Sequence, residues 1–175
     1  MQIDSDKEEI LIVYFSHSGN TRKIAEQIHK NIGRELVEIE TIDKYPTDHH
    51  EILEQARKEI GAGYKPALKT KIESIKEYPV LFLGYPNWWS TIPTPVSSFL
   101  EEHDLSGKTI APFCTHGTGG LARTVEAIKK LCPDSKVLDP LGIGNTRVNE
   151  AEKEVTEWLS HIGKVVKGDG LTFLN

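Results

Sequence analysis

A loop near the amino end combines residue types that can bind a phosphate group. It runs Ser16-His17-Ser18-Gly19-Asn20-Thr21, so it offers three hydroxyls and no acid, and its glycine lets the backbone approach a ligand closely. The apolar run at 10–15 precedes it and isoleucines at every fourth position from 24 to 32 follow it, which indicates a buried strand and then a helix. N–H groups and the dipole at a helix start favour an anion. The pattern predicts a phosphate site; an ordinary turn capped by Asn20 or Thr21 is the alternative.

A second loop contains two adjacent tryptophans, which are costly to expose to water. It runs Pro86-Asn87-Trp88-Trp89-Ser90-Thr91-Ile92 and follows the apolar run at 80–85. Flat indole rings stack on aromatic ligands, and their N–H groups need partners when they are buried. We interpret the pair as a contact to an aromatic ligand, and the alternative is that one or both tryptophans cover the hydrophobic core.

A third loop is rich in glycine and follows the apolar run at 109–114. It runs Thr115-His116-Gly117-Thr118-Gly119-Gly120, and its glycines permit close approach of the backbone to a ring or a phosphate. A flexible turn is the alternative. This loop alone is a weak signal, so its meaning depends on the other two loops.

Strand and helix patterns alternate along the chain and must position the three loops. Helical spacing occurs around 22–32, 52–60, 93–100, 121–131 and 149–162, and apolar runs of strand length are found at 10–15, 36–40, 80–85, 109–114 and 137–141. This alternation predicts an open, parallel α/β sheet with helices on both faces. Ligands of such sheets bind beyond the carboxyl ends of the strands, where all three loops are expected to lie. Pro112 cannot donate to a strand ladder, so we expect an irregularity there, and Pro140 places the last strand near an edge.

Length, charge and cysteine content exclude several classes of protein. The 175 residues predict one domain over 1–175, with a core at about 10–163 and a tail at 164–175. The net charge of −5 and the lack of a Lys/Arg cluster give no indication of nucleic-acid binding. No apolar run is long enough for a membrane span, and the polar start does not resemble a signal peptide. Cys114 and Cys132 form no CxxC motif, so we interpret them as packing thiols in a reducing, cytoplasmic compartment.

The sequence lacks particular residues that other kinds of nucleotide and metal site require. The run Gly142-Ile143-Gly144-Asn145-Thr146-Arg147 lacks the third glycine of a dinucleotide fingerprint, and no P-loop motif is present. The first loop lacks the cysteine nucleophile of a phosphatase, and the ends of the first and third predicted strands lack the acids of a phospho-receiver domain. His49 and His50 are adjacent, so their side chains diverge, and no carboxylate pattern accompanies them; no metal site is predicted.

In this order, each after its own strand, the three loops resemble those of the flavodoxin family. The similarity runs from about Ile10 to Gly163 and is that of the short-chain type, with a subgroup marked by Tyr-Pro-x-Trp-Trp. The resemblance implies a flavodoxin-like three-layer α/β/α sandwich with a five-stranded parallel sheet of order 2-1-3-4-5, and one non-covalent FMN. The FMN-binding residues that it implies are Ser16, His17, Ser18, Gly19, Asn20 and Thr21 at the phosphate, Pro86, Asn87, Trp88 and Trp89 beside the ring, and Thr115, His116, Gly117 and Gly119 along its other edge.

Two classes of function remain open, with a third less favoured. The first is a carrier that moves electrons on FMN between redox partner proteins. The second is an FMN-dependent NAD(P)H oxidoreductase of quinone-reductase type that acts on a small electron acceptor, and the third is a flavin-binding sensor module. The flavin does the redox chemistry in each case, so no catalytic side chain is predicted. The third loop lacks the tyrosine and acids common in carrier flavodoxins and is followed by Arg123, either a cation near the ring or a solvated residue. The role of 41–79 stays open.

Overall fold

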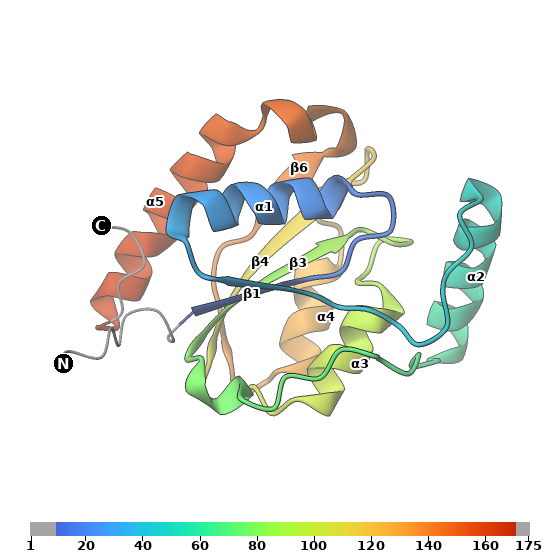
Figure 1. Ribbon diagram of the computed structural model, residues 1–175, viewed down its shortest axis with the longest axis horizontal. Helices are drawn as coiled ribbons and strands as arrows, with labels where there is room; N and C mark the ends of the chain where they lie inside the picture. Colours follow the sequence, from blue (N-terminus) through green and yellow to red (C-terminus); the bar gives the residue numbers. More distant parts are fainter. Residues whose placement is uncertain (1–9, 171–175) are drawn as a thin grey trace.

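A computed structural model of the chain describes residues 10–170, which form one parallel sheet of six strands that differ in length. Its strands run in the order β2-β1-β3-β4-β5, with β6 also paired to β4 (Figure 1). The strands are β1 (Ile10–Tyr14), β2 (Glu35–Glu38), β3 (Val80–Pro86), β4 (Thr109–His116), β5 (Lys136–Val137) and β6 (Leu141–Gly144). The predicted fold and strand order 2-1-3-4-5 are therefore confirmed.

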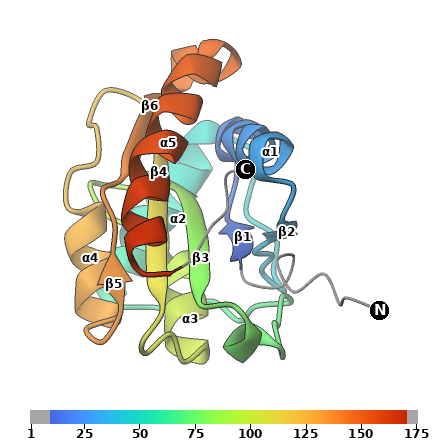
Figure 2. The ribbon, with the colours of Figure 1, turned by 90° about the vertical axis from the view of Figure 1, so that its left-hand side faces the viewer.

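Two pairs of helices cover the two faces of the sheet. The helices α1 (Asn20–Ile32) and α5 (Glu152–Gly168) lie on one face, and α3 (Thr94–Glu102) and α4 (Thr124–Leu131) lie on the other (Figures 1 and 2). Successive residues of β1 alternate between the two resulting cores, so every one of its five positions is buried. This is why the strand is an unbroken apolar run.

The irregularity expected at Pro112 lies in the neighbouring strand. Pro112 itself is in register with Leu83 of β3, and β4 is continuous around it. On its other side, β5 pairs only with the start of β4 and β6 only with its end. The predicted strand 137–141 is thus two short strands, because Pro112 and Pro140 both lack the N–H group that a continuous ladder needs.

The last helix is longer than predicted and starts differently. Residues Asn145–Glu150 form a 3-10 helix, η3, and α5 begins only at Glu152. It continues past Gly163 to Gly168 because Val166 extends its buried stripe by a further turn. Residues 164–168 of the predicted tail 164–175 are therefore helical, and its end, 171–175, lies outside the described residues.

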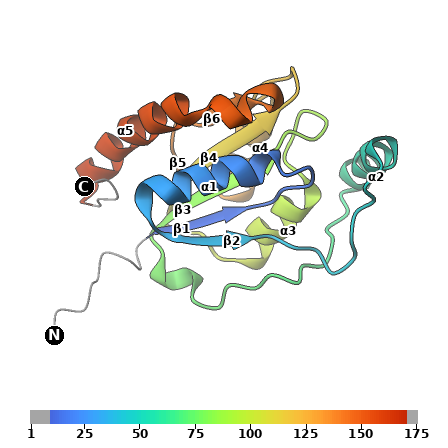
Figure 3. The ribbon, with the colours of Figure 1, turned by 45° about the horizontal axis from the view of Figure 1, so that its top comes forward.

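One helix belongs to neither layer. The helix α2 (His49–Ala62) lies beyond the carboxyl ends of the strands, at the right of Figure 1 and again in Figure 3. A short 3-10 helix, η2 (Ile75–Glu77), follows on the way back to β3. Within residues 10–170, no helix combines the length and apolar character that a membrane span requires.

Candidate functional site

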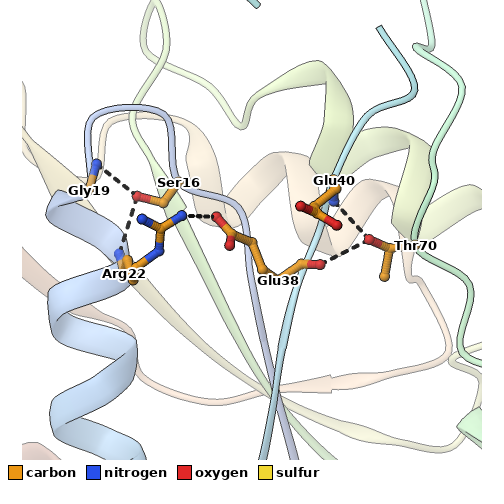
Figure 4. A network of polar contacts seen from close by, with 6 residues as sticks. All are labelled: Ser16, Gly19, Arg22, Glu38, Glu40 and Thr70. Atoms are coloured by element: carbon orange, nitrogen blue, oxygen red, sulfur yellow. Dashed lines mark hydrogen bonds and ion pairs between the residues drawn. The ribbon is translucent and has the colours of Figure 1, made fainter. Parts of the chain in front are cut away.

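The loop from β1 to α1 is shaped by the side chain of Ser16. Its Oγ accepts hydrogen bonds from the N–H groups of Gly19 and Arg22, both at 3.2 Å (Figure 4). Gly19 has a φ of 95°, which only glycine adopts readily. The Arg22 side chain turns away from the loop to Glu38 of β2, at 2.6 Å. Both bonds to Ser16 use oxygen lone pairs, so its hydroxyl proton remains available to a ligand.

A buried hydroxyl pair joins the first loop to the third. Thr21 Oγ1 and Thr115 Oγ1 are 2.7 Å apart, and each residue is 1% exposed. Thr21 lies in the first turn of α1, and Thr115 lies near the end of β4, 94 positions later in the chain. The pair therefore fixes the helix start against the carboxyl edge of the sheet.

Asn87 joins the second loop to the third. Its backbone N–H donates to the carbonyl of Thr115 at 2.9 Å, and its side-chain Nδ2 donates to the carbonyl of Gly120 at 2.8 Å. Its Oδ1 accepts from the N–H of Ser90 at 2.9 Å. Trp89 and Ser90 have φ values of 52° and 69°, a left-handed conformation unusual for such residues. The Asn87 bonds and the Trp89 side chain hold this turn in place.

The three loops open on a common cavity of about 320 Å³. Eight of the fourteen predicted site residues line it: His17, Ser18, Asn20, Pro86, Asn87, Trp88, Thr115 and His116. Among the described residues that line this cavity there is no acid, lysine or arginine; its titratable groups are histidines. A partly apolar wall with a few polar groups is typical of a small-molecule site in which those groups fix the orientation of the ligand.

The other six predicted residues lie around the cavity and do not line it. Ser16 and Thr21 hold the first loop as described, Gly19 forms its turn, and Trp89 is bonded to α2. Gly117 and Gly119 are exposed on the third loop; a Cβ on Gly119 would lie 3.4 Å from the Asn87 amide. The assignment of these six residues to a ligand stays a prediction, as it does for the eight that line the cavity.

The two adjacent tryptophans have opposite environments. Trp88 is 9% exposed and packs edge-on against the rings of Phe15 and Tyr45, while also lining the cavity. Trp89 is 48% exposed, and its Nε1–H donates to the carbonyl of Leu53 in α2 at 2.9 Å. Trp88 thus packs on the hydrophobic core and also faces the cavity, so both interpretations of the tryptophan pair apply to it. Trp89 instead attaches the loop to α2.

Sequence reasoning missed the side of the cavity formed by α2. Four of its residues, His49, Ile52, Leu53 and Ala56, line the cavity, together with Asn145 of η3. The helical spacing and the glycine stop of α2 were visible in the sequence. No local signal indicated that its apolar face would cover the carboxyl edge of the sheet instead of packing on a sheet face.

The remaining candidate functional residues lie away from the cavity or have no reactive form at neutral pH. Arg123 is exposed and does not line it, so the solvated reading holds for this structure. Burial raises the pKa of the Cys114 thiol to about 12, so it is not a nucleophilic thiolate at neutral pH. His50 is exposed beside His49, and residues 10–170 contain no cluster of three side chains able to hold a metal ion.

The comparison with known families identifies the chain. Residues 9–162 match a flavodoxin family model. The chain belongs to the flavodoxin family. The matched range ends inside α5 and includes all three loops and α2, so the whole candidate site lies within the family region. A search of curated proteins found no match.

Solved structures share the fold. A candidate flavoprotein from Bacteroides eggerthii DSM 20697 is 32% identical with a TM-score of 0.77, over 88% of this chain and 97% of that one. One from Bacteroides uniformis ATCC 8492 is 25% identical, with a TM-score of 0.77 over 87% and 97%. A flavoprotein from Lactobacillus acidophilus NCFM, solved in complex with FMN, is 21% identical, with a TM-score of 0.67 over 82% and 97%. At that identity, the last likeness concerns the fold alone.

Proposed function

We propose that this protein holds one FMN non-covalently in the cavity between its three loops and carries electrons on it between redox partner proteins. The cavity is the observation that supports this most. Loops whose residue types suit a phosphate, an aromatic ring and a polar ring edge open on the same space at the carboxyl edge of the sheet. The flavoprotein solved with FMN has the same fold. The Tyr-Pro-Asn-Trp-Trp run supports placement in the subgroup with that motif.

The first loop would hold the phosphate by neutral donors. Ser18 and Asn20 line the cavity, and Ser16 keeps a hydroxyl proton to donate. N–H groups in the first turn of α1 have no carbonyl acceptor within the helix, and the helix dipole adds to their attraction for an anion. The phosphate would therefore need no lysine or arginine.

The second and third loops would hold the ring. Trp88 offers a flat apolar wall, fixed in position by Phe15 and Tyr45. His116 lines the cavity, and its Nδ1 is buried without a hydrogen-bond partner among the described residues. A ring that carries hydrogen-bonding groups would supply the partner that His116 lacks, so the residues present fit the cofactor.

Bound FMN supplies the redox chemistry, and the protein controls its position, potential and access. The partly apolar cavity wall would exclude part of the water from the ring, and the described residues that line it include no carboxylate. The two cysteines are not thiolates near neutral pH, because burial raises the pKa of Cys114 to about 12 and that of Cys132 to about 11.

A titration with two flavins tests the proposal. The purified protein, freed of any bound flavin, is titrated with FMN and with riboflavin, and binding is followed by flavin absorbance and tryptophan fluorescence. We expect FMN to bind more tightly, because only FMN carries the phosphate that the first loop is built to hold. Equal affinity for the two flavins would contradict the assignment of the phosphate loop.

The position of α2 favours a second candidate function, an NAD(P)H-dependent oxidoreductase acting on a small acceptor. The helix contributes Ile52, Leu53 and Ala56 to the cavity wall, so one side of the ring site is covered by protein. A covered site suits a small planar acceptor such as a quinone better than a second protein. Stopped-flow mixing of the FMN-loaded protein with NADH or NADPH separates the candidates: fast flavin reduction followed by quinone turnover indicates the enzyme, and reduction only with a partner reductase indicates the carrier.

A further inference from the structure

The helix α2 carries a buried carboxylate that the proposed chemistry does not use. Glu59 is 7% exposed, although it belongs to the outermost helix of the molecule. No cation pairs with it in the part of the chain that the structure describes. A buried carboxylate without a cation needs neutral donors to offset its lost hydration.

Three neutral side chains supply those donors. Glu59 Oε1 accepts from Tyr45 Oη and Thr94 Oγ1, each at 2.7 Å, and its Oε2 accepts from Gln55 Nε2 at 3.0 Å. Burial raises the pKa of Tyr45, so its hydroxyl keeps its proton and remains a donor. We name these four residues the Glu59 cluster.

The Glu59 cluster connects α2 to the main body of the protein at two points. Thr94 is 4% exposed and begins α3, which is packed on the sheet. Tyr45 precedes α2 and packs against Trp88, a wall of the cavity. A single carboxylate thus fixes the helix to both a sheet-packed helix and the flavin-site wall.

The chain is also fixed on either side of α2, to the first loop before the helix and beside β2 after it. Before the helix, His17 Nε2–H donates to the carbonyl of Pro46 at 2.8 Å. After it, Thr70 Oγ1 donates to the carbonyl of Glu38 at 2.9 Å and accepts from the N–H of Glu40 at 2.8 Å (Figure 4). Between these anchors, α2 buries only Ile52, Ala56 and Glu59. The helix is therefore held at its ends, by the hydrogen bond from Trp89 Nε1–H to the Leu53 carbonyl and by the Glu59 cluster, and Ile52 and Ala56 are its buried apolar residues.

We propose that Glu59 is a positioning residue that keeps α2 closed over one side of the cavity and so hinders the approach of large partners from that side while leaving the bound flavin accessible to small molecules. The inference rests on the proposed function, because it requires FMN in the cavity. Without the carboxylate, Thr94 and Tyr45 lose their shared acceptor, and α2 opens between its two anchors while the loops beneath it stay in place.

The test compares Glu59→Leu, Glu59→Gln and a matched control, Glu54→Gln. Leucine removes the acceptor, whereas glutamine keeps an oxygen for Tyr45 and Thr94, and the Gln55 amide can turn its own oxygen towards the new NH2 group. Glu54 is exposed on the same helix, and within residues 10–170 its ion pair is with Arg57, so its variant repeats the charge change without touching the cluster.

The first measurement is amide hydrogen exchange of the FMN-free protein, resolved by segment. In Glu59→Leu we expect exchange in α2 to rise about tenfold or more while α1 and α5 keep their protection, because local opening alone sets the change. Glu59→Gln and Glu54→Gln should behave like the unmodified protein. Unchanged α2 exchange in Glu59→Leu, or an equal rise in all helices, would overturn the proposal.

The second measurement is oxidation of the reduced, FMN-loaded protein by a small and a large acceptor. We expect menadione to react at a similar rate with all variants. Cytochrome c should react about tenfold faster with Glu59→Leu alone, because the expected rise in α2 opening is about tenfold and opening of the helix exposes the site. Equal cytochrome c rates in all variants would overturn the proposal. If no variant, nor the unmodified protein, binds FMN, the proposed function fails, and the exchange data separately report whether Glu59 holds α2.

A second variant keeps the test valid if Glu59→Leu does not fold. The double change Tyr45→Phe with Thr94→Val removes two donors to Glu59 and retains the side-chain shapes, including the packing of ring 45 on Trp88. It should reproduce the α2 exchange and the cytochrome c acceleration. A double variant that matches the unmodified protein in both would contradict the role of the cluster.

Discussion

The helices α1 and α2 both border the cavity, but they are held by different forces. α1 buries five residues at helical spacing against the sheet, and its start is fixed by Ser16 and by the Thr21–Thr115 pair. α2 lies beyond the sheet and buries three residues, of which one is the carboxylate of Glu59. Its other attachments are hydrogen bonds from loops, such as that of Trp89 to the Leu53 carbonyl.

The contrast separates a fixed half of the site from a half that can move. Apolar burial of the α1 kind contributes most of the stability of a fold and opens only when the whole domain unfolds. A helix held by a few polar contacts opens at a lower free energy. We therefore expect the phosphate end of the site to be preformed and the ring end to be adjustable, and substitutions in the two halves can test this division.

The largest expected effect is that of Trp88→Ala. This side chain contacts Phe15 at the end of β1 and Tyr45 before α2, so it belongs to both halves. We expect a loss of about 3–5 kcal/mol in the unfolding free energy of the FMN-free protein, measured by urea denaturation.

Trp89→Ala is the matched control, because it changes the neighbouring tryptophan, which is 48% exposed. Its loss should be about 1 kcal/mol, the net value of one hydrogen bond. Equal losses of unfolding free energy in the two variants would contradict the difference in burial between Trp88 and Trp89.

Isoleucine truncation on the two helices compares the two halves directly. Ile28→Ala in α1 removes a fully buried side chain, and we expect a loss of about 2–5 kcal/mol in unfolding free energy. Ile52→Ala in α2 borders the cavity, so solvent can enter the space it leaves, and its loss should lie clearly below that of Ile28→Ala. Urea denaturation of both variants checks this; a larger loss at Ile52 would reverse the comparison.

The threonine pair tests how the fixed half is assembled. Thr21→Val leaves the buried Thr115 hydroxyl without its partner, which should lower the unfolding free energy by about 1–3 kcal/mol. Changing both threonines to valine removes both polar groups and should recover most of that loss. Additive losses in the double variant would mean that the two hydroxyls do not interact, and FMN affinity measured in parallel reports whether the loop also needs them.

The smallest expected effect is that of the ion pair beside the first loop. Arg22 and Glu38 are joined at 2.6 Å, but their side chains are 46% and 27% exposed. Arg22→Ala should change the unfolding free energy by less than about 1 kcal/mol, as exposed pairs do, and less still at high salt. FMN titration of this variant provides a further check, because the guanidinium points to Glu38 and should not be needed for the phosphate.

Much of the fold could be predicted because its signals are local. The strands are apolar runs whose successive residues face two cores, and the buried stripes of α1 and α5 repeat at helical spacing. The end of α2 is also visible in the sequence, because Gly63 takes the left-handed conformation after the last turn. Its start at His49, where the Asp48 side chain accepts from the N–H of Glu51, lies before the predicted range. The positions of the three loops could also be predicted, because each loop begins where an apolar run of strand length ends.

Tertiary structure decided what connects residues far apart in the chain. Thr21 bonds to Thr115, Glu59 to Thr94 and Trp89 to Leu53, over separations of 94, 35 and 36 positions. No periodicity within a helix or loop specifies such partners. For the same reason, the sequence predicted a helix around 52–60 but not that it covers the cavity, and it showed two tryptophans but not which one is buried. Both depend on polar and apolar contacts that exist only when distant segments have come together.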